Sequence, residues 1–136
     1  MGFYLEIVTP DKHLVSEEAD KVVCPGEAGE FCVLPGHAPL LSRLLLGDLR
    51  YVDSTLSKEH SMVVTGGYVE VTHDKVSVLA DECIRPREMN ITQAEADVAK
   101  AEEILKTAEK DTDAYRKAKW DYDYSRAIVK VGKKFQ

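Results

Sequence analysis

Turn-forming residues are unevenly distributed along this chain, and their distribution limits what each part can fold into. Seven of the eight glycines precede residue 70, and four of the five prolines precede residue 40. Both residues interrupt long helices, so we expect short elements and tight turns in the first part of the chain. Beyond residue 70 only one glycine and one proline occur, which leaves that part free to form long helices.

Short segments rich in valine and aromatic residues recur through the first part. Several short strands separated by turns are typical of an antiparallel sandwich or barrel. Apolar and polar residues alternate most clearly in 68–72 and 75–79, which predict a hairpin with one buried face. Gly66-Gly67 precedes this hairpin with no helix behind it, so it predicts a turn or bulge rather than a phosphate loop. The other expected strands are Tyr4–Thr9, Lys21–Cys24, Glu30–Leu34, Gly47–Val52 and Ser61–Thr65.

The segment Arg85-Pro86-Arg87-Glu88 ends the strand pattern, because proline restricts the residue before it. A helix then begins with one of two caps: Thr92 with Glu95 in capping-box spacing, or Asn90 with Gln93. The interruption at 111–113 separates it from a second helix. We therefore expect a β + α fold: an N-terminal antiparallel β-sandwich over residues 1–86, then an antiparallel two-helix hairpin over residues 87–136.

Apolar stripes at helical spacing support the hairpin. The first helix presents mostly alanine, so the hairpin gains little from burial by itself. A further face of the second helix carries Trp120, Tyr124 and Val131, and the first helix cannot cover it. Either this face packs permanently on the sandwich, or the hairpin has two alternative docked states. The two facing stripes are Ala94, Val98, Ala101, Leu105, Ala108 and Tyr115, Ala118, Tyr122, Ser125, Val129.

Composition limits the class of protein further. At 136 residues and 44% hydrophobic content, the chain can build one ordinary core and an extension. No run of residues is long and apolar enough to cross a bilayer, and the N-terminus lacks the pattern of a signal peptide, so we expect a soluble cytoplasmic protein. Residues 1–88 carry a net charge of −7, whereas the segment from Ala114 onward carries +5. A basic end on an acidic protein favours an acidic protein partner or an anion over nucleic acid.

Cys32 and His37 lie close together in the sequence, beside Glu30, and invite a catalytic or metal-binding hypothesis. A zinc site needs three or four ligands at a recognisable spacing, and a thiol nucleophile needs a base and a third group that orients it. Neither set is present, and three cysteines without a CxxC pair predict buried thiols rather than disulfides. We therefore expect no metal, no cofactor and no catalysis.

Three motifs carry a resemblance to a known family. The run from Gly29 to Leu41, which contains Pro35-Gly36-His37-Ala38-Pro39, is followed by Gly66-Gly67-Tyr68-Val69-Glu70-Val71 and Leu79-Ala80-Asp81. In order and spacing they resemble the epsilon subunit of F-type ATP synthases over nearly the whole chain, although Cys32 stands where the family more often has glycine. The resemblance implies a β-sandwich followed by two antiparallel helices, in a non-catalytic rotor subunit.

The partners implied by the resemblance are the gamma, alpha and beta subunits and the ring of c subunits, at the cytoplasmic face of the bacterial plasma membrane. In the family the sandwich binds gamma and rests on the c-ring, which predicts that Glu30 and His37 lie near the ring. The basic second helix can reach an acidic segment of the beta subunit and block rotation in the hydrolytic direction. The residues suited to that contact are Arg116, Lys117, Arg126, Lys130, Lys133 and Lys134.

Some members of the family bind ATP between the two helices as a regulatory ligand. The matching run here is Met89–Ala94, in which Asn90 replaces an acidic residue and Gln93 replaces an arginine. Only Arg126 and Lys130 match basic positions that face the nucleotide, so the resemblance predicts weak or absent ATP binding. The alternatives from other classes are a free-standing β-sandwich binding module with a helical dimerisation arm and, more remotely, a hydrolase built on Cys32 and His37.

Overall fold

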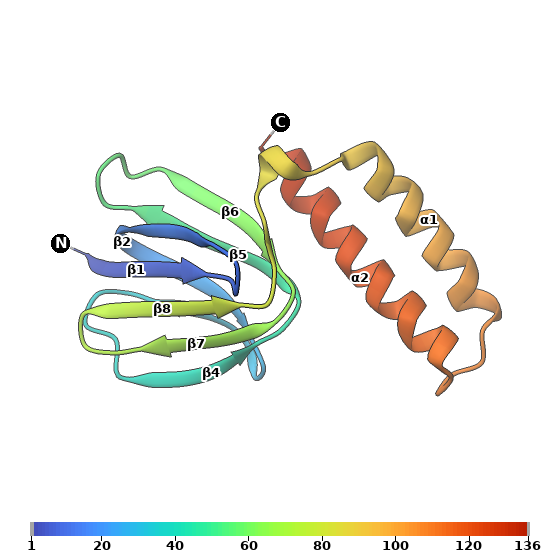
Figure 1. Ribbon diagram of the computed structural model, residues 1–136, viewed down its shortest axis with the longest axis horizontal. Helices are drawn as coiled ribbons and strands as arrows, with labels where there is room; N and C mark the ends of the chain where they lie inside the picture. Colours follow the sequence, from blue (N-terminus) through green and yellow to red (C-terminus); the bar gives the residue numbers. More distant parts are fainter. Residues whose placement is uncertain (1, 136) are drawn as a thin grey trace. The chain divides into compact units, whose positions relative to one another are not determined.

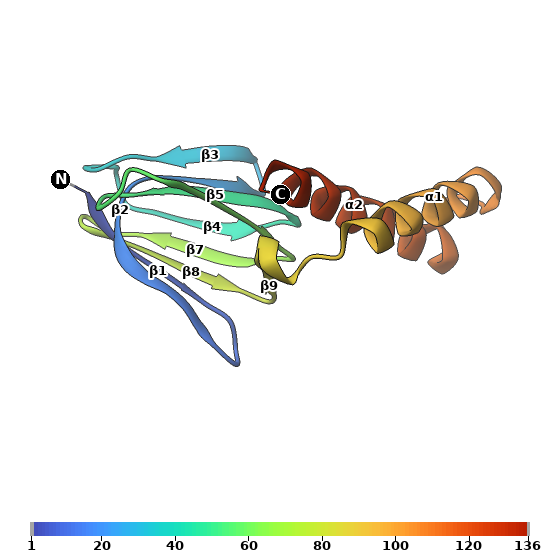
Figure 2. The same ribbon diagram turned by 90° about the horizontal axis from the view of Figure 1, so that it is seen from above.

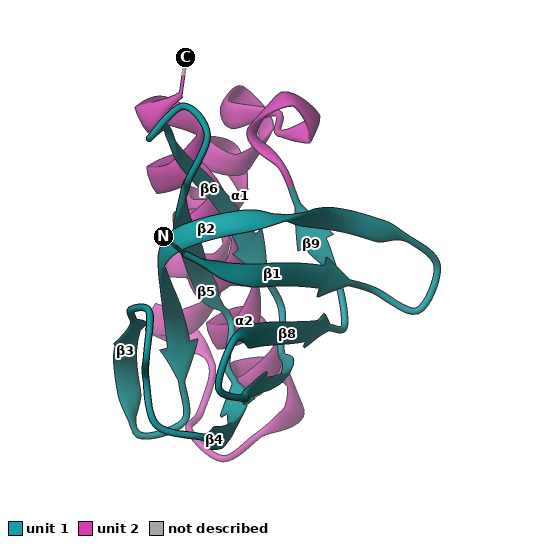
Figure 3. Ribbon diagram, turned by 90° about the vertical axis from the view of Figure 1, so that its left-hand side faces the viewer, with its two compact units in different colours: residues 1–84 teal, residues 85–136 magenta. Residues whose placement is uncertain are grey.

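The computed structural model describes residues 2–135, which divide after Ile84 into two compact units (Figure 3). This boundary lies two residues before the one predicted from the sequence, which falls between residues 86 and 87. Within the described residues, no helix is long and apolar enough to cross a membrane. The strands are β1 (Phe3–Val8), β2 (His13–Gly26), β3 (Gly29–Val33), β4 (Leu40–Leu44), β5 (Gly47–Asp53), β6 (Glu59–Val64), β7 (Gly67–Val71), β8 (Lys75–Ala80) and β9 (Cys83–Ile84). The helices are η1 (Pro86–Glu88), α1 (Ile91–Thr107) and α2 (Asp113–Lys134).

The first unit is a β-sandwich, as the sequence predicted. One layer runs in the order β1-β8-β7-β4 (Figure 1), and β3, β2, β5, β6 and β9 make the other. Figure 2 shows β3 and β5 on one side and β1 and β8 on the other. The 14-residue β2 serves both layers, because it pairs with β1 through one half and with β3 and β5 through the other.

Three features of the sandwich differ from the expected strands. β2 is much longer than Lys21–Cys24, and β4 and β9 were not expected as strands. The pairings are antiparallel except that of β1 with β8, which is parallel. The two strands are separated by most of the unit's sequence, and local alternation carries no information about which distant strand becomes a neighbour.

The core lies between the layers and follows the alternation of the strands. In the β7–β8 hairpin, Val69 pairs with Val78 and Val71 pairs with Val76, and all four side chains are buried. Gly67 begins β7 with φ of +130°, and a Cβ there would lie 2.0 Å from the Leu79 carbonyl oxygen. Only glycine fits that approach of two strands, which confirms the expected turn or bulge.

The second unit is the predicted helical hairpin. Its first cap is Asn90, whose side chain accepts a hydrogen bond from the Gln93 N–H at 3.0 Å, so the alternative with Thr92 as cap is wrong. Thr112 caps α2 in the same way, through the Tyr115 N–H. The small buried residues Ala94, Ala101, Ala118 and Ser125 belong to the two predicted stripes and let the helices approach closely.

Candidate functional site

The structure does not bring Glu30 and His37 together. Glu30 is the second residue of β3, beside the turn that joins β2 to β3. His37 follows the other end of β3, in the connection to β4. Each strand residue advances the chain by about 3.3 Å, so β3 alone separates the two by roughly 10 Å. The two residues therefore lie towards opposite ends of β3 and not in a single loop.

His37 closes a tight turn. Its backbone N–H donates to the Leu34 carbonyl at 3.1 Å, and Pro35 and Gly36 occupy the two central positions of the turn, with Gly36 at φ of +81°. Proline followed by a residue at positive φ is typical of a type II turn. The ring Nδ1 of His37 donates to the neighbouring Ala38 carbonyl at 2.7 Å. This local bond gives the side chain a role in the shape of the turn.

Glu30 is one member of an ion-pair cluster on the outer face of the second layer. The Arg50 guanidinium donates from Nη2 to Glu30 Oε1 and from Nη1 to Glu30 Oε2, both at 3.2 Å. Nη1 also donates to Asp48 Oδ1 at 3.0 Å. The hydrogen bond that Arg50 donates to Glu30, together with the negative charge of Asp48, raises the pKa of Arg50. The sequence did not indicate Arg50, because its neighbours in the sequence do not show that its side chain reaches Glu30 across β2.

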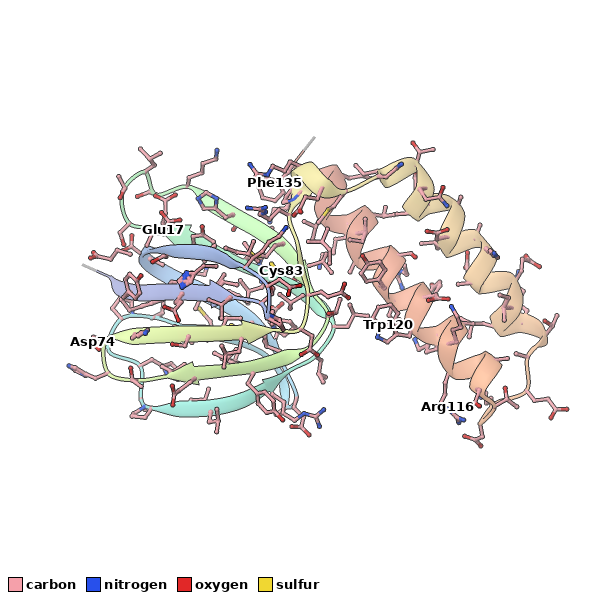
Figure 4. The ribbon with its side chains drawn as sticks, in the orientation of Figure 1. Glu17, Asp74, Cys83, Arg116, Trp120 and Phe135 are labelled. Carbon is pink, nitrogen blue, oxygen red and sulfur yellow. The ribbon has the colours of Figure 1, made fainter. Side chains whose placement is uncertain are left out.

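The basic residues proposed for α2 are spread along the helix, and several have partners within the hairpin. Arg116 pairs with Asp113 at 2.5 Å, and Lys117 pairs with Asp121 at 2.7 Å. Figure 4 shows Arg116 near the start of α2 and Trp120 one turn further along. Such i,i+3 and i,i+4 pairs contribute little to stability and leave the helix surface strongly charged.

The later basic residues form a separate stripe. Arg126, Lys130, Lys133 and Lys134 recur at helical spacing, and all four are exposed. Arg126 and Lys130 line a shallow groove between the helices, together with Val98, Val129 and Glu95. Glu95 also pairs with Lys133 at 3.1 Å. The groove thus brings the two predicted nucleotide contacts together, but it includes a carboxylate that would repel a phosphate.

A further surface, which the sequence did not single out, lies on the outer face of the β1-β8-β7-β4 layer. Tyr68 pairs with Arg43 on β4 and with Leu79 on β8, so the three side chains form one row across the sheet. Leu41 stands one row away, opposite Glu70. Leu41, Tyr68 and Leu79 are 71%, 52% and 53% exposed. We call Leu41, Arg43, Tyr68, Glu70 and Leu79 the outer patch.

Alternation could have found the outer patch. In 67–71 and 75–80 the valines take the buried positions, so Tyr68 and Leu79 fall on the opposite face. Apolar side chains on the solvent face of such a strand are a signal of docking rather than of folding.

A polar cluster in the sandwich surrounds the buried Asp53 carboxylate. Asp53 is 3% exposed and accepts hydrogen bonds from the Leu56 N–H at 2.6 Å and from His60 Nε2 at 2.8 Å. The hydrogen bond from the Leu56 N–H and, to a smaller extent, the one from His60 hold the pKa of Asp53 below its ordinary value. The Tyr51 ring stacks on His60, and its hydroxyl donates to Glu17, labelled in Figure 4, at 2.6 Å.

The cysteines do not assemble a reactive site. All three are free thiols, and burial raises the pKa of Cys24 to about 12, so that thiol stays protonated. Cys32 is exposed on β3 opposite Val23, whereas His37 belongs to the turn beyond the strand. Among the residues that the structure describes, no three His, Cys, Asp or Glu side chains gather in a way that could hold a metal ion.

Comparison with known proteins agrees with this architecture. Residues 2–86 match the family model of the ATP synthase delta/epsilon chain β-sandwich domain. The ATP synthase epsilon chain of Nitratidesulfovibrio vulgaris (strain DP4) is 42% identical over 115 residues, which cover 85% of this chain and 84% of that protein. The epsilon chain of Syntrophobacter fumaroxidans is 40% identical over 131 residues, covering 96% and 95% respectively.

Solved structures show the same fold at low sequence identity. A chain in the cryo-EM structure of the Euglena gracilis mitochondrial ATP synthase (OSCP, F1 and c-ring) matches 93% of this chain with a TM-score of 0.82 and 17% identity, over 79% of its own length. A chain of the Tetrahymena thermophila central stalk and c-ring matches with a TM-score of 0.63 and 14% identity, over 97% of both chains. With the family model and the bacterial relatives, these findings establish that the chain belongs to the epsilon chain family of ATP synthases.

Proposed function

We propose that the chain is a non-catalytic central-stalk subunit of a bacterial ATP synthase, with the sandwich as its anchor on the gamma subunit. The observation that carries this proposal is the outer patch. The exposed apolar side chains of Leu41, Tyr68 and Leu79 lie beside the charged Arg43 and Glu70, which is the composition of an interface centre with a polar rim. Tyr68 lies in the middle of the row, where an aromatic side chain contributes most to binding.

The ring contact is proposed for a different part of the sandwich. Glu30 lies beside the β2–β3 turn, with a half-exposed carboxylate that can accept hydrogen bonds from polar loops of the ring. His37 belongs to the turn beyond the opposite end of β3. We therefore propose that His37 contacts the stalk and does not contact the ring beside Glu30. The chain would then join the ring to gamma without any chemistry of its own, as a peripheral subunit on the cytoplasmic side of the plasma membrane.

The helical hairpin is the proposed regulator. In an extended state its stripe Arg126, Lys130, Lys133 and Lys134 would meet an acidic segment of the beta subunit, within the head formed by alpha and beta, and oppose rotation in the hydrolytic direction. The proposal needs two docked states of similar free energy, and a ligand would act by favouring one of them. ATP is a poor candidate for that ligand, because Glu95 lines the groove and Asn90 serves as a helix cap.

A charge placed in the outer patch tests the anchor. We expect Leu79→Asp to weaken binding of the full-length chain to gamma by about tenfold or more, because it desolvates a carboxylate at an apolar contact. Leu56→Asp is the matched control: Leu56 is 76% exposed but lies in the turn between β5 and β6, outside the patch. Equal affinities of the two variants for gamma, measured by calorimetry, would rule out the patch as the anchor.

A further inference from the structure

Arg50 stands at the centre of the charge cluster on the outer face of the second layer. β2 lies between β3 and β5, since Val23 pairs with Cys32 on one side and with Arg50 on the other. Glu30 pairs with Pro25 further along the same strand. The Arg50 side chain therefore crosses β2 to reach Glu30. Such a contact spans two strand spacings, roughly 10 Å, which an extended arginine and glutamate together can cover.

The contact has the geometry that fixes a carboxylate in one orientation. Two nitrogens of the guanidinium each donate to a different Glu30 oxygen at 3.2 Å. A bidentate pair of this kind defines the plane of the carboxylate as well as its position. A lysine at position 50 would supply the charge without the two parallel bonds.

Asp48 fixes the arginine in turn. Its carboxylate accepts from Arg50 Nη1 at 3.0 Å, and its side chain is only 10% exposed, compared with 54% for Glu30. Arg50 is thus anchored at a shielded carboxylate and presents its remaining bonds to an exposed one. We infer that Arg50 is a positioning residue, which holds the Glu30 carboxylate ready for the polar contact with the ring of c subunits; this inference rests on the proposed function.

The consequence for binding is a smaller ordering cost. A glutamate side chain loses rotamer freedom when it is fixed in a complex, and pre-ordering it in the free protein removes part of that cost. The benefit appears in the affinity for the ring and not in the stability of the fold, because ion pairs at the protein surface contribute little to unfolding.

The test uses the full-length chain bound to gamma, with purified c-rings in nanodiscs as the probe. We expect Arg50→Met and Glu30→Gln each to weaken ring binding by roughly three- to tenfold. The affinity of the double variant for the ring should be no lower than that of the single variant that binds less tightly. Arg50→Lys should fall between wild type and Arg50→Met. Asp48→Asn removes the anchor of Arg50 but neither member of the Arg50–Glu30 pair, so it should weaken ring binding by less than Arg50→Met does. Lys58→Met, which removes an exposed positive charge in the turn between β5 and β6, is the matched control. Because Arg50→Met leaves Asp48 without its arginine, Arg50→Met/Asp48→Asn is measured beside it.

A second readout is independent of the ring. The relaxation of the Glu30 side-chain methylene carbons in the free protein reports its mobility, and we expect it to be rigid in wild type and mobile in Arg50→Met. Equal mobility in the two proteins would overturn the positioning role, as would additive losses in the double variant or wild-type affinity in Arg50→Met. If wild type itself fails to bind the ring while Glu30 is rigid, the proposed ring contact is overturned and the ordering by Arg50 stands.

Discussion

Replacement of Gly67 by alanine tests the packing of the β7–β8 hairpin against a defined distance. An added Cβ would lie 2.0 Å from the Leu79 carbonyl oxygen and 2.9 Å from the Ala80 Cα. Both are backbone atoms, so no side-chain rotation relieves the contact, and the strands must separate where Gly67 pairs with Ala80. The positive φ of +130° adds a backbone cost of about 1–3 kcal/mol for any residue with a side chain.

Gly29→Ala separates the two contributions. Gly29 has φ of +116°, but a Cβ there would meet no atom within 4 Å. It should therefore show the backbone cost alone, about 1–3 kcal/mol. Gly67→Ala should add the cost of a forced backbone shift, and we expect its total loss in free energy of unfolding to exceed that of Gly29→Ala by about 2 kcal/mol or more.

The assay must report on the sandwich and not on the hairpin. Trp120, the chain's one tryptophan, lies in α2, so its fluorescence follows the hairpin. Urea unfolding should instead be followed through the backbone amide NMR signals of Val69 and Val78, which pair in the core. If both glycine variants lose the same free energy of unfolding, within about 0.5 kcal/mol, the close approach of the two strands does not constrain position 67.

Three further predictions concern the caps, the polar cluster and the groove. Asn90→Ala should destabilise the hairpin by about 1 kcal/mol in urea unfolding followed by Trp120 fluorescence, while Thr92→Ala should change it little; the reverse order would contradict the assigned cap. Because the folded-state pKa of Asp53 is lowered, its contribution is present above the ordinary aspartate pKa and is lost as pH falls through the folded value. Wild type should therefore lose more free energy of unfolding than Asp53→Asn between pH 7 and pH 3, and equal losses would refute the assignment. Millimolar ATP should leave the Tm unchanged, since Glu95 lines the groove; a saturable rise in Tm would show that nucleotide binds.

The sequence predicted the elements that local periodicity determines. The alternation of 68–72 and 75–79 gave the β7–β8 hairpin with its valines inside, and the stripes of Ala101 and Ala118 gave the facing sides of the two helices. Turn chemistry identified the position of Gly67. All of these depend on residues within about one turn or one strand of each other.

Features that depend on distant partners were not predicted. The parallel pairing of β1 with β8 joins residues 71 positions apart, as in Tyr4 with Lys75. The bond from Arg50 to Glu30 crosses an intervening strand, so sequence spacing cannot suggest it. Glu30 and His37 are only seven positions apart, yet they lie towards opposite ends of β3, because sequence proximity across a strand does not place two side chains at the same end of a sheet.

In the proposed function, the sandwich anchors the chain on gamma while the hairpin restrains hydrolysis. The most direct measurement is ATP hydrolysis by the cognate alpha-beta-gamma assembly with the full-length chain, with a chain that ends at Arg87, and with full-length Leu79→Asp at a concentration that saturates wild type. We expect suppression by the full-length chain alone, with the shortened chain still bound to gamma. Equal hydrolysis with the full-length and shortened chains, both bound to gamma, would contradict the regulatory role of the hairpin, and full suppression by Leu79→Asp would contradict the anchor.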